Sequence, residues 1–252
     1  MSASINLTQT IRQALPLIDL TRLEATDSDA DIESLCHQAK TPFGHPAAIC
    51  VYPRFVVTAR RALTAHSLSG NVRIAAVANF PDGGADVMAA ARETREAVAS
   101  GADEVDVVLP WRTLIDGDED TCLAFVEMCQ AACGGQALLK IILETGELKD
   151  PALIRRASEI AIEGGADFIK TSTGRVSVNA TPDAVEIMLH AIRDSGEAVG
   201  LKVAGGVDSA EDAAEYLALA RDIMGPAWIT PEHMRLGSSG LLANCVATLT
   251  AF

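Results

Sequence analysis

The chain has 252 residues, of which 49% are hydrophobic and 21% are charged, a composition typical of a folded globular protein. Its 34 acidic and 20 basic residues give a formal net charge of −14, and basic residues nowhere form a run, so we expect no nucleic-acid partner. No segment approaches about 18 consecutive apolar residues. The N-terminus lacks the apolar core of a signal peptide, so we expect a cytoplasmic protein without a membrane partner.

Short runs of β-branched and apolar residues alternate along the chain with Ala-, Glu- and Arg-rich segments of helical period. This alternation predicts repeated βα units and a parallel sheet. Most of the helical segments open on Asp or Ser, which favour a helix N-cap. The predicted strands span residues 16–21, 47–53, 73–80, 104–110, 137–145, 168–173, 199–205 and 234–239, and example helices span 29–39, 85–101, 150–165 and 208–223.

A weak internal repeat indicates how these units are arranged. The sequence Gly-Ala-Asp enters the strands at 104–110 and 168–173, and Lys202 follows Lys170 by 32 residues (202 − 170 = 32). Eight units of about 32 residues nearly fill the chain. We therefore predict a single domain over residues 1–252, with an α/β fold built as a (β/α)8 TIM barrel with an extra N-terminal helix. The alternative is a doubly wound open sheet, but no GxGxxG follows the first strand.

Two lysines and one aspartate lie inside predicted strands. Lys170 and Lys202 occupy the same point of successive units, and Asp106 precedes Lys170 by 64 residues (170 − 106 = 64). Alternate strands of a barrel contribute side chains to one interior layer, so we expect Asp106 and Lys170 to face each other. A buried ammonium costs several kcal/mol unless it is paired or loses its proton. The paired lysines therefore require a chemical explanation.

Amine chemistry provides that explanation. A free lysine has a pKa near 10.4 and is less than about 0.1% neutral at pH 7, whereas lowering the pKa by about 3 makes around half of it reactive. We expect burial to supply part of this decrease and the second cation to supply more, which is one way to activate a Schiff-base lysine. Asp106 would hold the two charges apart and relay protons. The residues alone leave open which lysine forms the imine.

Four further residues are candidates for the same pocket. Lys140 lies in a predicted strand on the same face as Glu144, and is a rival nucleophile or a charge paired inside the pocket. Cys50, near a predicted strand end, has no evident His partner, so we expect a packed thiol rather than a reactive one. Asp19 and Thr21, at the end of the first strand, are candidate pocket residues, although Asp19 would be equally ordinary at a helix entry.

The sequence contains no recognisable metal-ligand pattern. Six cysteines are scattered without a CxxC pair, so we expect reduced, buried thiols. The five histidines form neither HxH nor HExxH. We therefore expect no metal site.

Two glycine-rich segments are candidate anion cradles. AGG (204–206) follows the seventh predicted strand, and GSSG (237–240) follows the eighth and leads into a helix, whose free N–H groups attract anions. Barrels frequently bind phosphate on the loops after these two strands. Residues directly after the sixth strand could add a hydroxyl, an amide and a guanidinium. The candidate phosphate ligands are Thr173, Gly174, Arg175, Gly205, Gly206, Gly237, Ser238 and Ser239.

These motifs resemble the 2-deoxyribose-5-phosphate aldolase family of class I aldolases nearly end to end. The resemblance rests on LIDLTRL, AAICVYPRF, GADEVDVVLP, GADFIKTSTG, LKVAGGV and the GSS segment. It implies the reversible aldol cleavage of 2-deoxy-D-ribose 5-phosphate to D-glyceraldehyde 3-phosphate and acetaldehyde, without a cofactor or metal. It also implies that Lys170 forms the Schiff base, that Lys202 and Asp106 transfer protons, and that the protein is a homodimer.

The sequence departs from this family pattern at three points. Arg175 stands where related members have Lys, which keeps the charge but changes the geometry. Val203 stands where Pro or Ala is expected between the second lysine and AGG. The sequence ends in TLTAF, without the longer tail ending in Tyr that some members fold over the pocket, so we expect no proton-transfer role for such a tail.

Two other functions fit the same fold, because this barrel hosts many chemistries. One is a phosphosugar isomerase that uses Glu or His as its base. The other is a non-catalytic protein that binds a phosphorylated metabolite, which would leave the two lysines unexplained. Reduction with borohydride in the presence of acetaldehyde would distinguish a Schiff-base enzyme from both.

Overall fold

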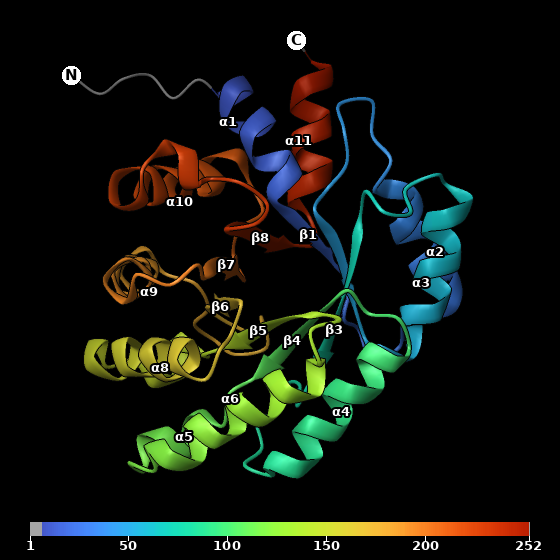
Figure 1. The fold of residues 1–252 in the computed structure, drawn as a ribbon. Coiled ribbons are helices and arrows are strands. Elements are labelled where there is room, and N and C mark those ends of the chain that lie inside the picture. The colour runs from blue at the N-terminus through green and yellow to red at the C-terminus, as the bar shows by residue number, and fades with distance from the viewer. Residues whose placement is uncertain (1–6, 252) are drawn as a thin grey trace, which may run out of the picture.

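The structure, a computed structural model, describes residues 7–251 and contains a closed barrel of parallel strands in the order β1 to β8. Helices surround the strands as an outer ring (Figure 1). The predicted (β/α)8 TIM barrel is therefore confirmed, and the alternative of an open sheet is wrong. The strands are β1 (Ile18–Thr21), β2 (Ala48–Val51), β3 (Arg73–Ala78), β4 (Glu104–Val108), β5 (Leu138–Ile142), β6 (Phe168–Lys170), β7 (Gly200–Ala204) and β8 (Met234–Ser238).

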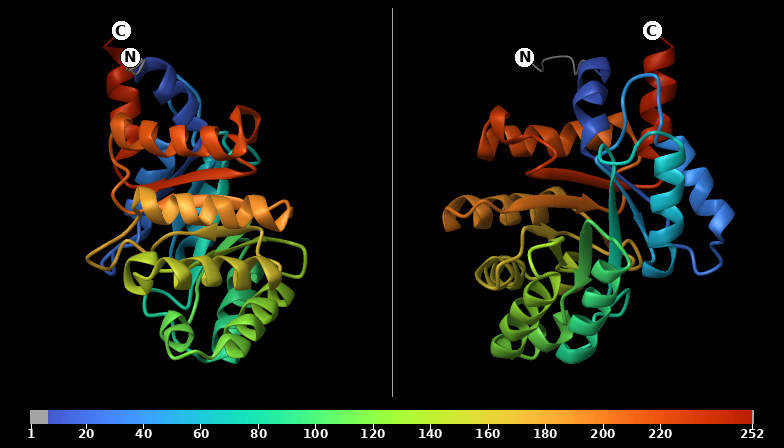
Figure 2. Two further views of the ribbon diagram at one scale, coloured as in Figure 1. Left: turned by 90° about the vertical axis from the view of Figure 1, so that its left-hand side faces the viewer. Right: turned by 45° about the vertical axis from the view of Figure 1, so that its right-hand side comes forward.

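The extra N-terminal helix α1 precedes the first strand and packs against α10 and α11. Figure 2 shows α1 and the C-terminal helix side by side at one end of the molecule. The helices are α1 (Leu7–Ala14), α2 (Asp29–Gln38), α3 (Val56–Ala65), α4 (Val87–Ala99), α5 (Trp111–Ile115), α6 (Glu119–Cys133), α7 (Thr145–Leu148), α8 (Pro151–Glu163), α9 (Pro182–Ser195), α10 (Ala210–Met224) and α11 (Leu241–Thr250), with 3₁₀ turns η1 (Leu15–Leu17), η2 (Pro53–Phe55) and η3 (Pro226–Trp228).

Polar N-caps begin the helices at the predicted positions. Ser28 caps α2 and Ser209 caps α10, each in a reciprocal capping box with an Asp three residues later. Asp86 and Asp150 accept hydrogen bonds from first-turn N–H groups of α4 and α8. These side chains satisfy donors that would otherwise lack a partner at a helix start. The predicted Asp and Ser helix starts are confirmed.

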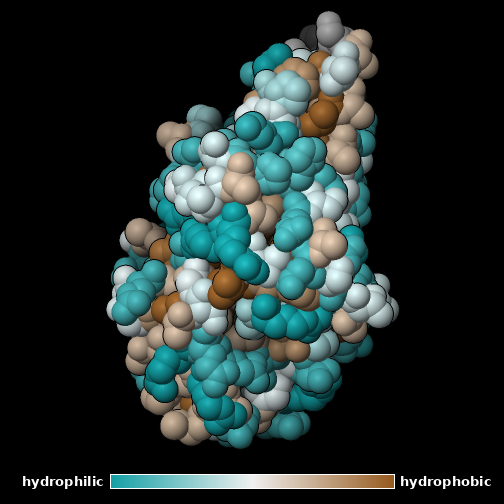
Figure 3. Space-filling view, turned by 90° about the vertical axis from the view of Figure 1, so that its right-hand side faces the viewer, coloured by the Kyte–Doolittle hydropathy of each residue, from teal (hydrophilic) through white to brown (hydrophobic). Residues whose placement is uncertain are grey.

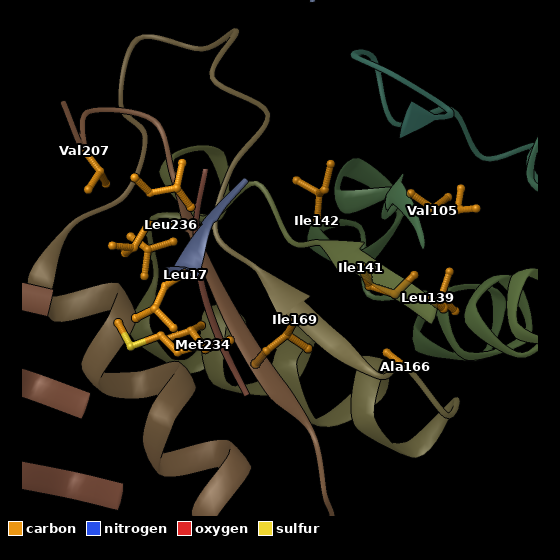
Figure 4. Close-up of a cluster of buried hydrophobic side chains, with 14 of the residues drawn as sticks. Leu17, Val105, Leu139, Ile141, Ile142, Ala166, Ile169, Val207, Met234 and Leu236 are labelled. Atoms are coloured by element: carbon orange, nitrogen blue, oxygen red, sulfur yellow. The ribbon is translucent and has the colours of Figure 1, made fainter. Parts of the chain in front are cut away.

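The strands have an apolar outer layer, and the inner layer carries the charged side chains, except on β2 and β3, where Cys50, Ala75 and Val77 form a small apolar cluster. Leu139 and Ile141 of β5 join Val105 and Ile169 from the neighbouring strands in a fully buried cluster, drawn in Figure 4. Lys140 lies between the first two in sequence and is also fully buried, but it pairs with charged groups instead. Successive side chains of a strand point to opposite faces. When the apolar side chains of a strand pack against the helices, the charged side chains between them therefore point into the barrel.

All strands except β1 end before their predicted ends, and the difference is largest for β5 and β6. The prediction of 137–145 overshoots β5, because Glu144 adopts a left-handed conformation (φ 58°) that an extended strand does not accommodate. The prediction of 168–173 overshoots β6, which ends at Lys170. Thr171 and Ser172 are nevertheless completely buried. The residues after both strands thus form the mouth of the barrel rather than its wall.

None of the helices within residues 7–251 is long and apolar enough to span a membrane. The face drawn in Figure 3 is largely hydrophilic, and its apolar residues lie in small separate patches.

Gly200 provides a test of packing inside the barrel. It pairs in register with Phe168, and a Cβ at this position would overlap the Phe168 ring. Gly200→Ala should therefore lower the free energy of unfolding by about 1–3 kcal/mol, as overpacked cores do. Urea denaturation would measure the change, and the double variant with Phe168→Leu should recover part of the loss. An unchanged midpoint in Gly200→Ala would contradict the tight fit.

Candidate active site

Three predicted catalytic residues meet at the floor of the barrel mouth. Lys170 of β6 and Lys202 of β7 are register neighbours, and Asp106 reaches them from β4. The Asp106 Oδ2 atom accepts hydrogen bonds from Lys170 Nζ at 2.9 Å and Lys202 Nζ at 2.7 Å. Only Lys170 retains any exposure, at 3%, against 0% for the other two. The predicted facing of Asp106 and Lys170 is confirmed.

A second set of charges lies beneath this floor. Lys140 donates to Asp106 Oδ1 at 2.9 Å and to Glu104, and it approaches Asp19 at 3.4 Å. Lys202 also contacts Asp19, at 2.6 Å. Arg235 of β8 bridges Asp19 and Glu104, at 2.8 Å to each. Every one of these groups is buried, so the barrel interior holds a single connected ion network.

The network carries unequal numbers of opposite charges. Among its buried members, four cations face three carboxylates, so loss of one proton from a lysine would balance the buried charge. Arg73 also contacts Glu104, at 3.3 Å, but its side chain is 43% exposed. An unbalanced charge in a low-dielectric interior is costly, which favours that loss. The cations are Lys140, Lys170, Lys202 and Arg235, and the carboxylates are Asp19, Glu104 and Asp106.

The lysine that most readily loses a proton is Lys170. Burial lowers its pKa, and the like charge of Lys202 lowers it further, against the opposing pull of Asp106. Burial acts on Lys202 in the same direction, but Asp106 and Asp19 outweigh it and raise the pKa of Lys202 well above its ordinary value. The expectation that the second cation would contribute more than burial is wrong, because burial is the larger cause.

Asp106 is an ionised partner rather than a ready base. Burial alone would raise its pKa, but the ammonium groups of Lys140, Lys170 and Lys202 hold that pKa well below the usual range. Lys140 is correspondingly a paired charge, since Asp106, Glu104 and Asp19 overcome burial and raise its pKa. Of the two interpretations of Lys140, the structure favours the paired charge over the rival nucleophile.

Cys50 lies next to the network, with Sγ 4.0 Å from Asp106 Oδ2. Burial raises the pKa of this thiol, so the packed thiol that we expected describes it better than a reactive one. All six cysteines are free and buried, as predicted.

A cavity of about 410 Å³ lies above the two lysines. It is open to the loops that follow β1, β6, β7 and β8, which the barrel gathers at one end. Asp19, Asp106, Cys50 and Lys140 lie beneath it rather than in its lining. The predicted residues that do line the cavity are Thr21, Lys170, Thr173, Gly174, Arg175, Lys202, Gly205, Gly206, Gly237, Ser238 and Ser239.

Two glycines shape this cavity through the absence of a side chain. Gly205 has a left-handed backbone (φ 86°), and a Cβ there would lie 2.5 Å from Asn179 Cβ. A Cβ on Gly237 would lie 3.0 Å from Lys202 Cε. The first glycine permits the turn after β7, and the second leaves room for the Lys202 side chain.

Glu144 organises the loop after β6, a role that the sequence did not reveal. Its carboxylate accepts hydrogen bonds from Thr173 N at 3.1 Å and from Thr173 Oγ1 at 2.6 Å. The Thr173 hydroxyl oxygen in turn accepts from Arg175 N at 3.0 Å. Burial raises the pKa of Glu144, and the bonds from Thr173 oppose that rise. Glu144 thus supports the cavity wall instead of sharing a face with Lys140.

Arg235 is another site residue that was not predicted, although the sequence contains a signal for it. It is a charged residue inside an otherwise apolar strand, as the two lysines are, and it is 1% exposed. Glu104 lies two residues before Asp106 in β4, and nothing in the strand pattern indicates its pairing with Arg235 at 2.8 Å. Such pairing between β4 and β8 depends on barrel closure, which strand patterns do not specify.

Residues 14–242 match the family model of the DeoC/LacD family aldolases. The chain belongs to this aldolase family. The match covers all eight strands and the whole ion network. Aldolases are lyases that act on small molecules, so the lysine-floored cavity is the natural candidate for the active site of this one.

Solved structures agree with the family assignment. A candidate deoxyribose-phosphate aldolase from Toxoplasma gondii ME49 is 25% identical with a TM-score of 0.87, covering 97% of this chain and 98% of its own. One from Coccidioides immitis is 27% identical with a TM-score of 0.80, covering 95% and 87%. A deoxyribose phosphate aldolase from Aeropyrum pernix, described as having a unique tetrameric structure, is 21% identical with a TM-score of 0.74, covers 99% of both chains, and supports the fold alone.

Across residues 7–251, no three His, Cys, Asp or Glu side chains are grouped so as to hold a metal ion. That this aldolase needs no metal stays a prediction.

The ion network of this aldolase should dominate its response to acid. Lys140→Met would leave Glu104 and Asp106 short of a partner and should lower the free energy of unfolding by about 3–5 kcal/mol at neutral pH. Because the folded-state pKa values of both carboxylates are depressed, their contribution is present above the unfolded pKa of about 4 and is lost as the pH falls. The difference between wild type and variant should therefore shrink in acid, as urea denaturation at several pH values would show.

The matched control is Arg156→Met. Arg156 makes ion pairs on the surface with Glu119 and Glu163, and its side chain is 32% exposed. Loss of such pairs should cost less than about 1 kcal/mol. Equal losses in the two variants would contradict the importance of the buried network.

Proposed function

We propose that this aldolase reversibly cleaves 2-deoxy-D-ribose 5-phosphate to D-glyceraldehyde 3-phosphate and acetaldehyde through a Schiff base on Lys170. One observation carries the proposal: the cavity floor presents a lysine of lowered pKa beside a second lysine of raised pKa. The first is suited to attack a carbonyl as a neutral amine, and the second is suited to hold a proton. The resemblance of the FIKTSTG and LKVAGG motifs supports the same roles.

The chemistry begins at the aldehyde carbon C1 of the open-chain sugar. Neutral Lys170 Nζ adds to C1, and loss of water yields an iminium at C1, to which C2 is the α carbon. The Lys202 amine, left neutral after it has protonated the departing water, accepts the proton of the C3 hydroxyl, and the C2–C3 bond breaks. The bonding electrons move onto the iminium and form an enamine, while C3 leaves as the aldehyde of glyceraldehyde 3-phosphate. Protonation of the enamine at C2 and hydrolysis release acetaldehyde and restore Lys170.

Lys202 and Asp106 would manage the protons of these steps. Lys202 belongs to the cavity lining, and its raised pKa keeps it an ammonium that can protonate the hydroxyl that leaves as water. Asp106 contacts both amines through one carboxylate oxygen, so it can stabilise the iminium charge that replaces the lost ammonium. Its depressed pKa keeps it ionised throughout.

The loops at the mouth would receive the 5-phosphate. The candidate ligands Gly205, Gly206 and Ser239 lie on the loops after β7 and β8, and Gly174 lies after β6. Backbone N–H groups in such turns are common phosphate donors.

No specific observation favours an isomerase or a non-catalytic binder, because neither uses the amine pair. The cytoplasmic location and the homodimer stay predictions.

Trapping of the imine tests the mechanism and the residue together. Incubation with acetaldehyde and borohydride should leave a stable ethyl group on Lys170 and abolish activity, because hydride reduces the iminium to a secondary amine. Peptide mass spectrometry would locate the group, and Lys170→Met should take up none. Labelling of Lys202 or Lys140 instead, with Lys170 unmodified, would overturn the assignment.

The pH profile tests the role of Lys202. Lys202→Leu removes a like charge and leaves Asp106 with one fewer partner, so both changes should raise the pKa of Lys170. Since activity needs the neutral amine, the acidic limb of kcat/KM should move to higher pH. Each tenfold rise in the proton affinity of Lys170 should lower kcat/KM at neutral pH by about tenfold, which rate measurements across the pH range would show.

Lys40→Leu is the matched control, because Lys40 is an exposed lysine that donates to the His66 carbonyl away from the cavity. Its pH profile should match that of the wild type. An unchanged profile in Lys202→Leu would argue against coupling between the two lysines.

A further inference from the structure

A carboxylate occupies the end of the cavity where an anion would bind. Asp208 lines the cavity, and its Oδ1 accepts a hydrogen bond from Ser238 Oγ at 2.7 Å. The same oxygen lies 3.3 Å from the position that a Cβ would take on Gly240, the N-cap residue of α11. Helix N-termini favour negative charge. At the N-terminus of α11, the Asp208 carboxylate already supplies this negative charge.

Three donors at the predicted GSSG cradle, on Ser238, Gly240 and Leu241, are already engaged around this carboxylate. Ser238 Oγ accepts from Gly240 N at 3.1 Å and from Leu241 N at 3.0 Å while its proton is directed to Asp208. The first N–H groups of α11 therefore have a partner before any ligand arrives. The loop after β7 is similar, because Asp208 N and Ser209 N both donate to Asp212, at 3.1 and 2.9 Å.

Both guanidinium groups in the cavity lining are also paired. Arg175, the predicted phosphate ligand, contacts the Leu23 carbonyl and Glu24, the latter at 3.2 Å. Arg22 contacts Asp27 at 2.8 Å and Asp31 at 2.9 Å. Glu24 and Asp31 are themselves part of the lining. The positive charge that a phosphate would seek is thus offset by neighbouring carboxylates.

A phosphate dianion and a hydroxyl group would experience this end of the cavity differently. The dianion would meet the like charge of Asp208 and compete for donors that already have acceptors, which costs free energy. A hydroxyl group can instead donate to the Asp208 carboxylate, a favourable charge-assisted hydrogen bond. Asp208 is exposed, so solvent screens its charge and the effect should be moderate.

We propose that Asp208 is a specificity-determining residue that suppresses the preference for a phosphorylated substrate. On this proposal, which rests on the proposed Schiff-base function, the aldolase cleaves unphosphorylated 2-deoxy-D-ribose with an efficiency close to that for the 5-phosphate. The terminal C5 hydroxyl donates to Asp208, and the phosphate ester gains little at the start of α11, where the donors of Ser238, Gly240 and Leu241 already have acceptors.

Asp208→Asn tests the proposal, because Asn retains an oxygen that can accept from Ser238 but removes the charge. The measured quantity is the phosphate preference, the ratio of kcat/KM for 2-deoxy-D-ribose 5-phosphate to that for 2-deoxy-D-ribose. We expect a ratio below about 10 in the wild type and a rise of about tenfold in the variant, as loss of one nearby like charge predicts. A wild-type ratio in the thousands, unchanged by the variant, would overturn the role of Asp208.

Binding of inorganic phosphate gives a second readout that needs no sugar. Isothermal titration calorimetry should show weak binding to the wild type and about tenfold tighter binding to Asp208→Asn, for the same electrostatic reason. Glu127→Gln is the matched control, since it removes one exposed negative charge from α6, far from the cavity lining. Equal affinity of wild type and Asp208→Asn for phosphate, or the same increase in Glu127→Gln, would contradict a local effect.

These experiments distinguish failure of the specificity proposal from failure of the proposed Schiff-base function. Trapping of acetaldehyde on Lys170 depends on the floor of the cavity and not on Asp208. If Lys170 is labelled but the phosphate preference of Asp208→Asn is unchanged, the specificity proposal fails alone. If no lysine is labelled, the Schiff-base function fails, and the binding of inorganic phosphate still reports on whether Asp208 repels the anion.

Discussion

The contact of one carboxylate with three ammonium groups is the interaction on which this site depends. Asp106 binds Lys140 through one oxygen, and Lys170 and Lys202 through the other. In a dry interior such charges are tolerated only when they are paired and hydrogen-bonded. The surplus cation then falls on Lys170, which has Asp106 as its ion-pair partner, whereas Lys202 also has Asp19. A structural requirement for charge balance thus selects the lysine that can act as an amine.

The barrel makes this arrangement possible because it separates the apolar and charged faces of each strand. The outer faces bury an extensive apolar layer against the helices, which provides the main stabilisation. The inner faces carry the ions, whose burial is a weak source of stability and whose positions are therefore better explained by chemistry. Arg235 and Glu104 show the same division, because neither lines the cavity. Arg235 holds Asp19, which contacts Lys202. Glu104 holds Lys140, which contacts Asp106.

Sequence patterns predicted the barrel, its eight strands and the position of Asp106 opposite Lys170, because strand alternation and repeat length are local properties. They did not predict Arg235 as a partner of Glu104, since that contact spans 131 residues and exists only after closure. They overestimated β5, because the left-handed conformation of Glu144 gives no sign in an apolar run. They also identified glycine and serine segments as anion cradles without showing that Ser238 and Asp208 satisfy those donors internally.

Electrostatic interactions are therefore screened to different extents at the two ends of the cavity. At the floor, burial removes solvent screening, so charges separated by less than 3 Å fix the protonation of each amine. At the mouth, Asp208 and Glu24 are exposed, and their influence on a ligand is moderated by water and salt. A change at the mouth can alter the preferred substrate while the amine chemistry is unaffected, because no residue of the ion network contacts Asp208 among the hydrogen bonds and ion pairs of residues 7–251. This separation is what allows an aldolase of fixed mechanism to differ in its demand for phosphate.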